Sequence, residues 1–303
     1  MPPYEPISVC IPAHNEEATI GSTLDSILRQ DYPGEMEITV CANACTDGTE
    51  EEVRRLQTQH PNLHLLSTPE KGKPNAWNML RETATHDYHF FTDADVTVHP
   101  TAFRHLYHTL ESRQDLVAAG GMIVPYLEES DWLTSLITPK PGPQGCLIGR
   151  LYAYHEEKLK SRMQHWGYPQ MPSDIIHEDA WLSLVIGIQQ WTTHYEAKVY
   201  YYPWNWSEAI QRQAQEKRGI QQLKQDYPHL LNERPFWEEP ALQRRLAKLQ
   251  HLHGVRDFIE YAAGRPLRIF IRWRASRLPN PSAPTGWYSA RSSKRIIPLS
   301  RIT

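Results

Sequence analysis

Cysteine is scarce in this sequence, with four residues in 303, and no two of them have Cys-x-x-Cys spacing. That spacing is the usual sign of a structural zinc site or a redox motif, so both are disfavoured. The four residues, Cys10, Cys41, Cys45 and Cys146, lie in apolar segments. We therefore predict reduced, buried thiols in a cytoplasmic protein.

Long hydrophobic runs are also absent. The apolar stretch Ala180–Ile188 falls well short of the about 20 residues that cross a bilayer, and the mean hydropathy is -0.59. The first five residues, Met1–Glu5, lack the basic start and apolar run of a secretory signal. We expect no membrane-spanning helix and a chain that stays in the cytoplasm.

The well-known phosphate-binding loops are missing too. No Gly-x-Gly-x-x-Gly follows a predicted strand, and no Gly-x-x-x-x-Gly-Lys-Ser/Thr occurs, which disfavours a dinucleotide-binding fold and a P-loop. Apolar residues nevertheless make up 40% of the chain, enough to bury a sizeable core.

Charge is divided unevenly along the chain. Residues 240–303 contain 13 Lys and Arg against Asp257 and Glu260, a formal charge of +11, whereas the rest contains 19 basic and 33 acidic residues, a charge of -14. A cationic tail on an anionic body indicates a polyanion, an anionic membrane surface or a phosphorylated acceptor as partner.

The first 124 residues alternate between strand and helix patterns. Short apolar runs predict strands at Ile7–Ile11, Met36–Ala42, Leu63–Ser67, Tyr88–Thr92 and Leu116–Val124. Apolar stripes with helical spacing predict helices around residues 20–28, 76–84 and 103–110. Strands that start 25 to 29 residues apart are typical of βα units, which build a parallel sheet flanked by helices.

The second half is less regular. Residues 126–175 are rich in Pro, Gly and aromatic residues and are predicted to form a long loop over the sheet edge. A helix is expected from Glu178, burying Trp181, Leu184, Val185 and Ile188, and another over residues 207–227. Basic helices and an irregular end broken by Pro279, Pro281, Pro284 and Gly286 should follow.

Two aspartates in Asp93-Ala94-Asp95 directly follow a predicted strand. Ligands of open α/β sheets bind at the carboxyl ends of the strands. Two carboxylates there can hold one hard divalent cation together with diphosphate oxygens. The alternative is a turn with helix-capping aspartates, a common use of this residue type.

Four ordered segments resemble family 2 glycosyltransferases of the GT-A fold. They are Ile7–Glu17, Ala42–Thr49, Lys71–Asn78 and Phe91–Asp95, and the likeness covers about residues 6–220. The resemblance implies an α/β fold with a mostly parallel sheet and a nucleotide-sugar site. Pro12, Ala13 and His14 would line the base, and Glu16 would support the pocket.

The same resemblance assigns the rest of the donor site. Asn43 stands where the family often has aspartate, and its amide can still bind the uracil of a UDP-sugar. Lys73 would meet the nucleotide end of the donor. Asp93 would face the ribose and the metal shell, and Asp95 would ligate Mn²⁺ or Mg²⁺.

His177-Glu178-Asp179 opens the helix predicted about eighty residues later. Acids in a first helical turn commonly complement the helix dipole. In the family an acidic pair at this place supplies the catalytic base, so Asp179 would deprotonate the acceptor hydroxyl and Glu178 would hold the loop or the acceptor. The implied reaction is a single displacement with inversion at the anomeric carbon.

Further segments carry weaker likenesses. Gly149–Ala153 resembles a family segment beneath the donor sugar and includes Tyr152, although it also fits an ordinary strand start. Arg212 and Arg218 lie where processive members carry Gln-x-x-Arg-Trp. No Trp occurs there, so we expect a non-processive enzyme. The two arginines would neutralise diphosphate or form a solvated helix face.

Residues 265–278 interleave Arg with Leu, Ile, Phe and Trp. Such a pattern fits an anionic membrane surface, contacted through residues 265–303 on its cytoplasmic face. Packing on the acidic body is the alternative, and we do not expect nucleic acid as a partner. The acceptor would be a glycan or a lipid-linked molecule, which points to cell-surface glycan or glycolipid synthesis.

The expected organisation is a donor-binding half over residues 1–125, an acceptor-binding and catalytic half over residues 126–235, and a basic extension over residues 236–303. Two rival functions are a sugar-1-phosphate nucleotidyltransferase and a non-catalytic binding module. The first would need a Gly-rich basic loop where Pro12–Asn15 stands, and the second would have no use for Asp95 and Asp179.

Overall fold

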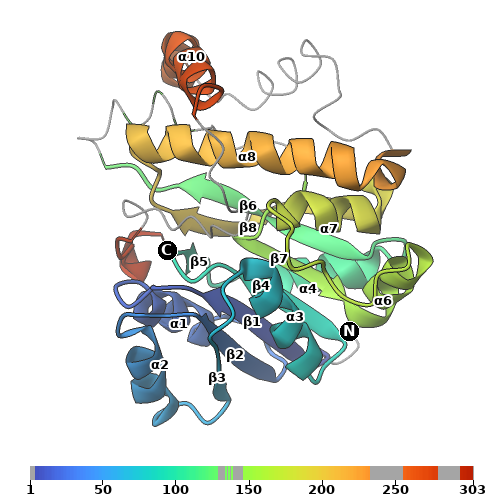
Figure 1. Cartoon of the computed structure of the whole chain (residues 1–303). Helices are drawn as coiled ribbons and strands as arrows, with labels where there is room; N and C mark the ends of the chain where they lie inside the picture. The colour runs from blue at the N-terminus through green and yellow to red at the C-terminus, as the bar shows by residue number, and fades with distance from the viewer. Residues whose placement is uncertain are drawn as a thin grey trace.

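One eight-stranded sheet, in the order β3-β2-β1-β4-β7-β6-β8-β5, organises the protein (Figure 1). The computed structural model describes residues 4–128, 134, 136, 138, 146–232, 255–278 and 294–302. The strands are β1 (Ile7–Ala13), β2 (Met36–Asn43), β3 (Leu63–Thr68), β4 (Tyr88–Thr92), β5 (Thr97–Val98), β6 (Ala118–Pro125), β7 (Leu151–His155) and β8 (Trp191–Tyr201).

The four strands β3, β2, β1 and β4 are parallel, and β6 pairs in parallel with β8. Helices α1 (Ile20–Leu28), α2 (Thr49–Gln57), α3 (Lys73–Thr83) and α4 (Ala102–Ser112) connect or follow the strands of this half. The five predicted strands and the three predicted helices are therefore confirmed, and α2 is an additional helix that the apolar pattern did not indicate.

The prediction of a long loop over residues 126–175 is wrong for its second part. Residues 151–155 form β7, which pairs antiparallel with both β4 and β6, and α6 (Glu156–His165) follows directly. The side chains of β7 are buried on both faces, so the strand shows no polar alternation, and only the alternative interpretation of Gly149–Ala153 as a strand start indicates it. The segment Pro139–Pro143 lies outside the described residues.

Two hydrophobic layers cover the two faces of the sheet. Along β1, Ile7, Val9 and Ile11 pack toward α1 and α4, whereas Cys10 packs toward α3. The second face is also covered by α6, α7 (Glu178–Ile186) and α8 (Trp206–Asp226). The alternation of side chains in a strand thus gives each face its own core.

Helix α7 is shorter than the sequence predicted. His177 precedes it as the N-cap residue, and its Nδ1 accepts a hydrogen bond from the Ala180 N–H at 3.3 Å. The helix ends at Ile186 because Gly187 adopts a φ of 98°, which side chains disfavour. Ile188, predicted to be buried in the helix, is half-buried in the 3₁₀ helix η2 (Ile188–Gln190) that follows.

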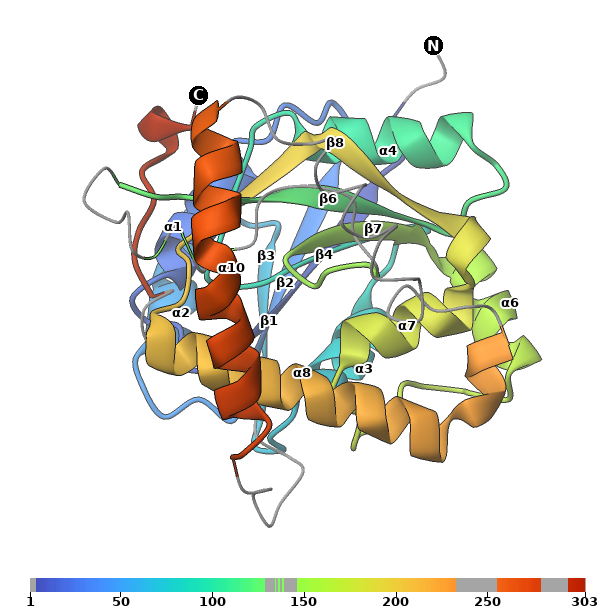
Figure 2. The ribbon, with the colours of Figure 1, turned by 90° about the horizontal axis from the view of Figure 1, so that it is seen from above.

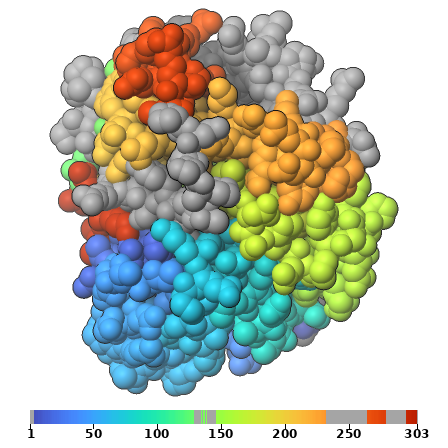
Figure 3. Space-filling model, in the orientation of Figure 1, coloured from blue at the N-terminus to red at the C-terminus, as the bar shows by residue number. Residues whose placement is uncertain are grey.

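Helix α8 agrees with its predicted bounds and starts with a capping box between Asn205 and Glu208. Helix α10 (Val255–Ala275) packs across α8 (Figure 2) and forms an outer projection in the space-filling view (Figure 3). No helix among the described residues is long and apolar enough to cross a membrane. The short helices η3 (Pro228–Asn232) and η5 (Leu299–Arg301) complete the described structure, and the predicted irregular end from Pro279 to Gly286 lies outside it.

All four cysteines have free thiols. Cys10 and Cys41 are buried as predicted, whereas Cys45 and Cys146 are only half-buried. Burial raises the pKa of Cys41 to about 12, so this thiol stays protonated near neutral pH.

Candidate functional site

The loops that leave β1, β2 and β4 meet at one edge of the sheet (Figure 1), because these neighbouring strands run parallel. The first loop carries His14 and Glu16, the second begins after Asn43, and the third contains Asp93 and Asp95. Thr23 of α1 holds the third loop, since its Oγ1 lies 2.9 and 2.8 Å from the carbonyl oxygens of Ala94 and Val96. The carbonyls on both sides of Asp95 are thereby fixed.

Lys73, the first residue of α3, connects the two predicted acidic sets. Its Nζ lies 2.8 Å from Asp93 Oδ1 and 2.8 Å from Glu178 Oε1. Burial alone would lower the pKa of Lys73, but Asp93, Glu178 and the nearby Asp179 raise it well above its usual value. Lys73 is therefore a permanent cation that holds the start of α7 against the end of β4.

Glu178 and Asp179 are adjacent in sequence, but their pKa values are shifted in opposite directions. Burial would raise the pKa of Glu178, yet the ammonium of Lys73 outweighs it and lowers the pKa to about 2. Burial and the charge of Glu178 raise the pKa of Asp179 to about 7, despite the opposing effect of Lys73. Near neutral pH, Glu178 is a fixed anion and Asp179 can take up or release a proton.

Gly149 allows the chain to pass close to this pair. Its backbone donates a hydrogen bond to the Asp179 carboxylate. A Cβ added at Gly149 would lie 2.7 Å from Lys73 Nζ and 2.8 Å from Asp179 Oδ1. Any side chain here would displace one of these groups, so the position requires glycine.

Tyr152 lies beneath the site, in β7. It is buried, its hydroxyl accepts a hydrogen bond from Trp77 Nε1 at 2.8 Å, and its ring stacks on Phe91 with centroids 5.6 Å apart. Tyr152 thus belongs to a buried aromatic cluster with Trp77 and Phe91. Its place beneath a donor sugar stays a prediction.

Glu16 is buried beside the third loop. Thr19 donates a hydrogen bond to Glu16 Oε2 at 2.9 Å, and Lys294 Nζ lies 3.6 Å from the same oxygen. Burial and then the charge of Asp95 raise the pKa of Glu16 to about 8, although Lys294 and Thr19 act in the opposite direction. The influence of Asp95 shows that the two carboxylates are close enough to interact.

His14 and Asn43 stabilise the loops of the site. His14 is buried with Pro12 and Ala13, and its Nδ1 donates to the Asn43 carbonyl oxygen at 2.6 Å. The Asn43 amide is fully buried, donates to the Glu70 carbonyl at 2.6 Å and accepts from the Gly72 N–H at 2.8 Å. The amide therefore holds loop 70–72, and its predicted contact with a base stays a prediction.

The two predicted arginines of α8 lie apart from each other. The pKa of Arg212 is raised, because Glu216, whose Oε1 lies 3.7 Å from its Nε, together with the more weakly acting Glu178 and Asp179 outweighs its burial. Its Nε has no hydrogen-bond partner among the described residues. Arg218 instead lines a cleft between α8 and α10 with Lys217.

The carboxylates fit a divalent cation only in part. No group of three or more His, Cys, Asp or Glu side chains with metal-binding geometry exists within the described portion of the chain. Asp93 and Asp95 are half-exposed at the edge, and one oxygen of Asp93 is already bound to Lys73. Mg²⁺ and similar ions often take one or two carboxylates and complete their shell with substrate phosphates and water, which these residues allow.

Two residues of this edge, Gly149 and Lys294, carry no functional signal of their own in the sequence. Gly149 belongs to the segment Gly149–Ala153, and Lys294 is one of the 13 basic residues of the tail. No local pattern indicates that Lys294 lies beside Glu16, almost 280 positions earlier in the chain.

The fold and the acidic, lysine-centred edge define a protein of the GT-A type. The sequence profile of glycosyl transferase family 2 matches residues 8–179, more than half of the chain. The chain therefore belongs to glycosyl transferase family 2, and the predictions of family and fold are confirmed.

Curated relatives agree at lower coverage. Poly-beta-1,6-N-acetyl-D-glucosamine synthase of Staphylococcus epidermidis is 28% identical over 117 residues, which are 39% of this chain and 28% of the relative. Glucosyl-dolichyl phosphate glucuronosyltransferase of Haloferax volcanii is 29% identical over 163 residues, 51% of this chain and 49% of the relative. The chain thus spans half or less of the length of these relatives.

A solved structure supports the fold. The mannosyltransferase PcManGT of Pyrobaculum calidifontis, in complex with GDP-Man and Mn²⁺, superposes with a TM-score of 0.60. It is 21% identical to this chain, and the match covers 89% of this chain and 85% of that one. At this identity the likeness establishes the shared GT-A fold.

Proposed function

We propose that this protein is an inverting, non-processive glycosyltransferase that moves a sugar from a nucleoside-diphosphate donor to a hydroxyl group of a glycan or lipid-linked acceptor. The observation that carries the proposal is the double ion pair of Lys73, 2.8 Å from both Asp93 and Glu178. It supports the proposal because it joins Asp93, a predicted donor carboxylate, to Glu178, the neighbour of the predicted base Asp179.

The proposed reaction assigns different work to the two acidic sets. Asp179 takes the proton of the acceptor hydroxyl, whose oxygen forms the new bond to the anomeric carbon while the bond to the diphosphate oxygen breaks. A base poised near the working pH suits this step, and the pKa of Asp179 is about 7. Attack from the face opposite the leaving group inverts the anomeric carbon.

Positive charge must meet the departing diphosphate. Asp95 and Asp93 would hold Mn²⁺ or Mg²⁺, which supplies that charge when bound. Arg212 interacts electrostatically with the same acidic pair, and its buried Nε lies 3.7 Å from Glu216 Oε1 without a hydrogen bond to any described residue. We assign to Arg212 the second contact with the diphosphate, and we leave Arg218 out of the site.

The proposed organisation follows from where the carboxylates originate. Residues 1–125 bear Glu16, Asp93 and Asp95 and would bind the donor, whereas residues 126–235 bear Asp179 and would position the acceptor. Two solved structures of similar fold contain different nucleotides, GDP-Man in PcManGT and UDP in S. aureus TarS. Both UDP and GDP are therefore suitable probes, with UDP as the predicted ligand.

Calorimetry with UDP and GDP, with and without Mn²⁺, tests the donor site. The unaltered protein should bind one of them more tightly in the presence of Mn²⁺. Asp95→Ala should weaken that binding at least about tenfold, since a contact to a charged group contributes roughly 1.5–3 kcal/mol. The matched control is Asp25→Ala, an exposed carboxylate on α1. If Asp95→Ala bound the nucleotide as tightly as the unaltered protein does in the presence of Mn²⁺, the metal role of Asp95 would be contradicted.

We also propose that α10 lies on an anionic membrane surface, on the cytoplasmic face. Three large apolar side chains of this helix are exposed, Ile269 by 58%, Phe270 by 50% and Trp273 by 46%. Four exposed arginines, Arg265, Arg272, Arg274 and Arg277, lie in the same stretch of the chain. An apolar stripe flanked by arginine is the pattern of helices that rest in an interface, and the four free thiols fit a reducing compartment.

The opposite face of α10 is already occupied. Ile271 and Ala275 are buried, α10 packs on α8, and Arg268 donates to the Leu136 carbonyl at 2.7 Å. Packing on the body and an outward apolar face are therefore both present on one helix. The relative whose name includes dolichyl phosphate supports a lipid-linked acceptor near such a surface.

Co-sedimentation with liposomes tests this surface. The double substitution Phe270→Ala, Trp273→Ala should lower the bound fraction on phosphatidylserine vesicles several-fold, because each large side chain contributes roughly 1.5–3 kcal/mol of burial. Tyr195→Ala, which removes an exposed aromatic side chain of β8, should bind as the unaltered protein does. Equal binding of all three proteins would refute the membrane proposal.

A further inference from the structure

The C-terminal segment 294–302 runs along the carboxyl edge of the sheet. Near its start, Lys294 Nζ lies 3.6 Å from Glu16 Oε2, beyond the end of β1. Near its end, an Arg301 guanidinium nitrogen donates to the Tyr126 hydroxyl at 3.3 Å, just after β6. The segment thus connects the two halves of the sheet at the edge where the site lies.

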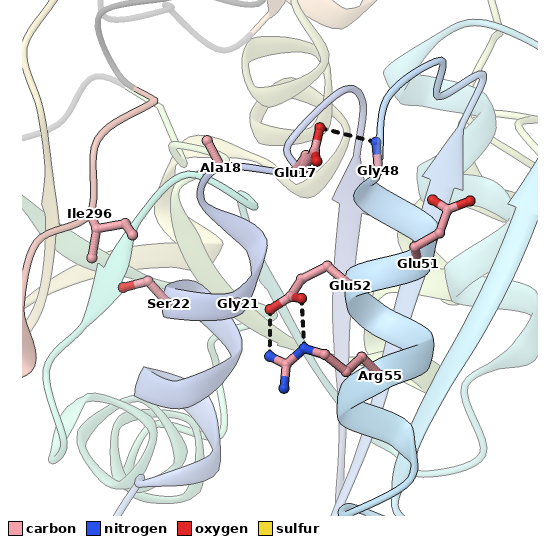
Figure 4. Close-up of a pocket in the computed structure, with 9 residues that line it drawn as sticks. All are labelled: Glu17, Ala18, Gly21, Ser22, Gly48, Glu51, Glu52, Arg55 and Ile296. Carbon is pink, nitrogen blue, oxygen red and sulfur yellow. Dashed lines mark hydrogen bonds and ion pairs between the residues drawn. The ribbon is translucent and has the colours of Figure 1, made fainter.

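This segment is held in place between these two ends. Ile297 is only 2% exposed, and its carbonyl oxygen accepts a hydrogen bond from Thr97 Oγ1 of β5 at 3.1 Å. Ile296 lines the same pocket as Ser22 of α1 (Figure 4). Arg295 places its guanidinium over the Tyr202 ring, 5.5 Å from the centroid. The three residues that directly follow Lys294 are therefore in contact with neighbouring elements.

Lys294 is a cation placed at an edge of the sheet that is rich in carboxylates. Five carboxylates gather there, on Glu16, Asp93, Asp95, Glu178 and Asp179, and Lys73 is engaged by two of them. A diphosphate is itself strongly anionic, so its binding requires further cations. Lys294 is half-buried next to Glu16, and its charge also acts on Asp47 after β2.

The contact of Lys294 with Glu16 is loose. At 3.6 Å it is an ion pair but is too long for a hydrogen bond, in contrast to the 2.8 Å contacts of Lys73. A lysine ammonium on a flexible four-carbon stem can exchange such a contact for a stronger one with a phosphate oxygen. Lys73, which two carboxylates hold at short distance, cannot do so without losing both.

We propose that Lys294, delivered by the C-terminal segment, is a donor-binding residue that contacts the diphosphate of the nucleotide sugar. This inference rests on the proposed function and extends it. It makes the donor site composite, with the carboxylates supplied by the loops of β1 and β4 and one cation supplied from the far end of the chain.

Nucleotide binding by the full chain tests the proposal, with UDP and GDP as probes in Mn²⁺ and in EDTA. Lys294→Met should weaken binding by about tenfold in both conditions, and Lys294→Arg should restore most of it. The matched control is Arg295→Met, which removes the neighbouring charge that faces Tyr202, and its affinity should stay within about twofold of the unaltered protein.

Three results would overturn the proposal. Unchanged affinity of Lys294→Met would remove Lys294 from the site, and equal losses in Lys294→Met and Arg295→Met would reduce its effect to the general charge of the tail. Tighter binding of Mn²⁺ by Lys294→Met, with unchanged nucleotide affinity in EDTA, would show that Lys294 competes with the cation. If the unaltered protein bound neither nucleotide, the proposed function itself would fail, which is distinct from these three results.

Discussion

Asp179→Asn is expected to lower turnover by about 10²–10⁴-fold and to leave the affinity for the nucleoside diphosphate within about twofold of the unaltered protein. The asparagine amide retains the size of the side chain and a hydrogen-bond acceptor for Gly149, but it cannot take a proton from the acceptor hydroxyl. Donor contacts originate from β1, β4 and α3, so they should persist. Steady-state rates together with calorimetry would separate the two effects.

The pH dependence of the unaltered enzyme follows from the same residue. The pKa of Asp179 is raised to about 7 by burial and by Glu178, so a large share of the side chain is protonated below pH 7 and cannot act as a base. We expect kcat/KM to rise with pH through about 7 and then to level off. A profile that is flat between pH 5.5 and 8.5 would place the base elsewhere.

Thermal unfolding provides the control that Asp179→Asn is folded. An unfolded aspartate has a pKa of about 3.9, and the folded value is higher. The protonated side chain therefore contributes stability that is fully present below about pH 4 and is lost as the pH rises through about 7. Asparagine undergoes no such loss. The variant should accordingly be at least as stable as the unaltered protein at pH 8, so its inactivity would not arise from unfolding.

Lys73→Met should have the largest effect on stability. The substitution removes the cation that lies 2.8 Å from both Asp93 and Glu178, and all three side chains are at least three-quarters shielded from solvent. Removing one partner of a buried ion pair costs about 3–5 kcal/mol because the other charge is left uncompensated. The site is partly open, so we expect about 3 kcal/mol, measured by urea unfolding.

Two further variants give this prediction its controls. Lys71→Met removes an exposed lysine two residues earlier and should change the free energy of unfolding by less than about 0.5 kcal/mol. Adding Glu178→Gln to Lys73→Met removes one uncompensated charge and should restore part of the stability. Equal stabilities of the Lys71 and Lys73 variants would mean that the ion pairs contribute nothing to the fold.

The first half of the fold, residues 1–125, is predictable from the sequence because its signals are local. Apolar runs at regular intervals specify β1 to β4, and the polar residues that follow each run mark the edge where parallel strands end. Asp93 and Asp95 could be found from their place after β4 without any knowledge of distant contacts. The family likeness of four ordered segments then indicated the fold and the enzyme class.

The acceptor half was less predictable because its elements depend on distant partners. β7 is a five-residue strand inserted between β4 and β6, and nothing in its own sequence indicates which strands will flank it. The fold buries the amide of Asn43 against loop 70–72, a contact that the residues around Asn43 do not indicate. Pairing and burial are properties of the assembled sheet.

By itself, the sequence determined the βα order, the carboxylates at the sheet edge and the family. The tertiary structure alone decided that Lys73 joins Asp93 to Glu178, that Asp179 titrates near pH 7, and that Lys294 reaches Glu16. The physical reason is that periodicity and residue type are encoded over a few neighbouring positions. Charge coupling and desolvation, in contrast, depend on distances that exist only after residues far apart in the chain have packed together.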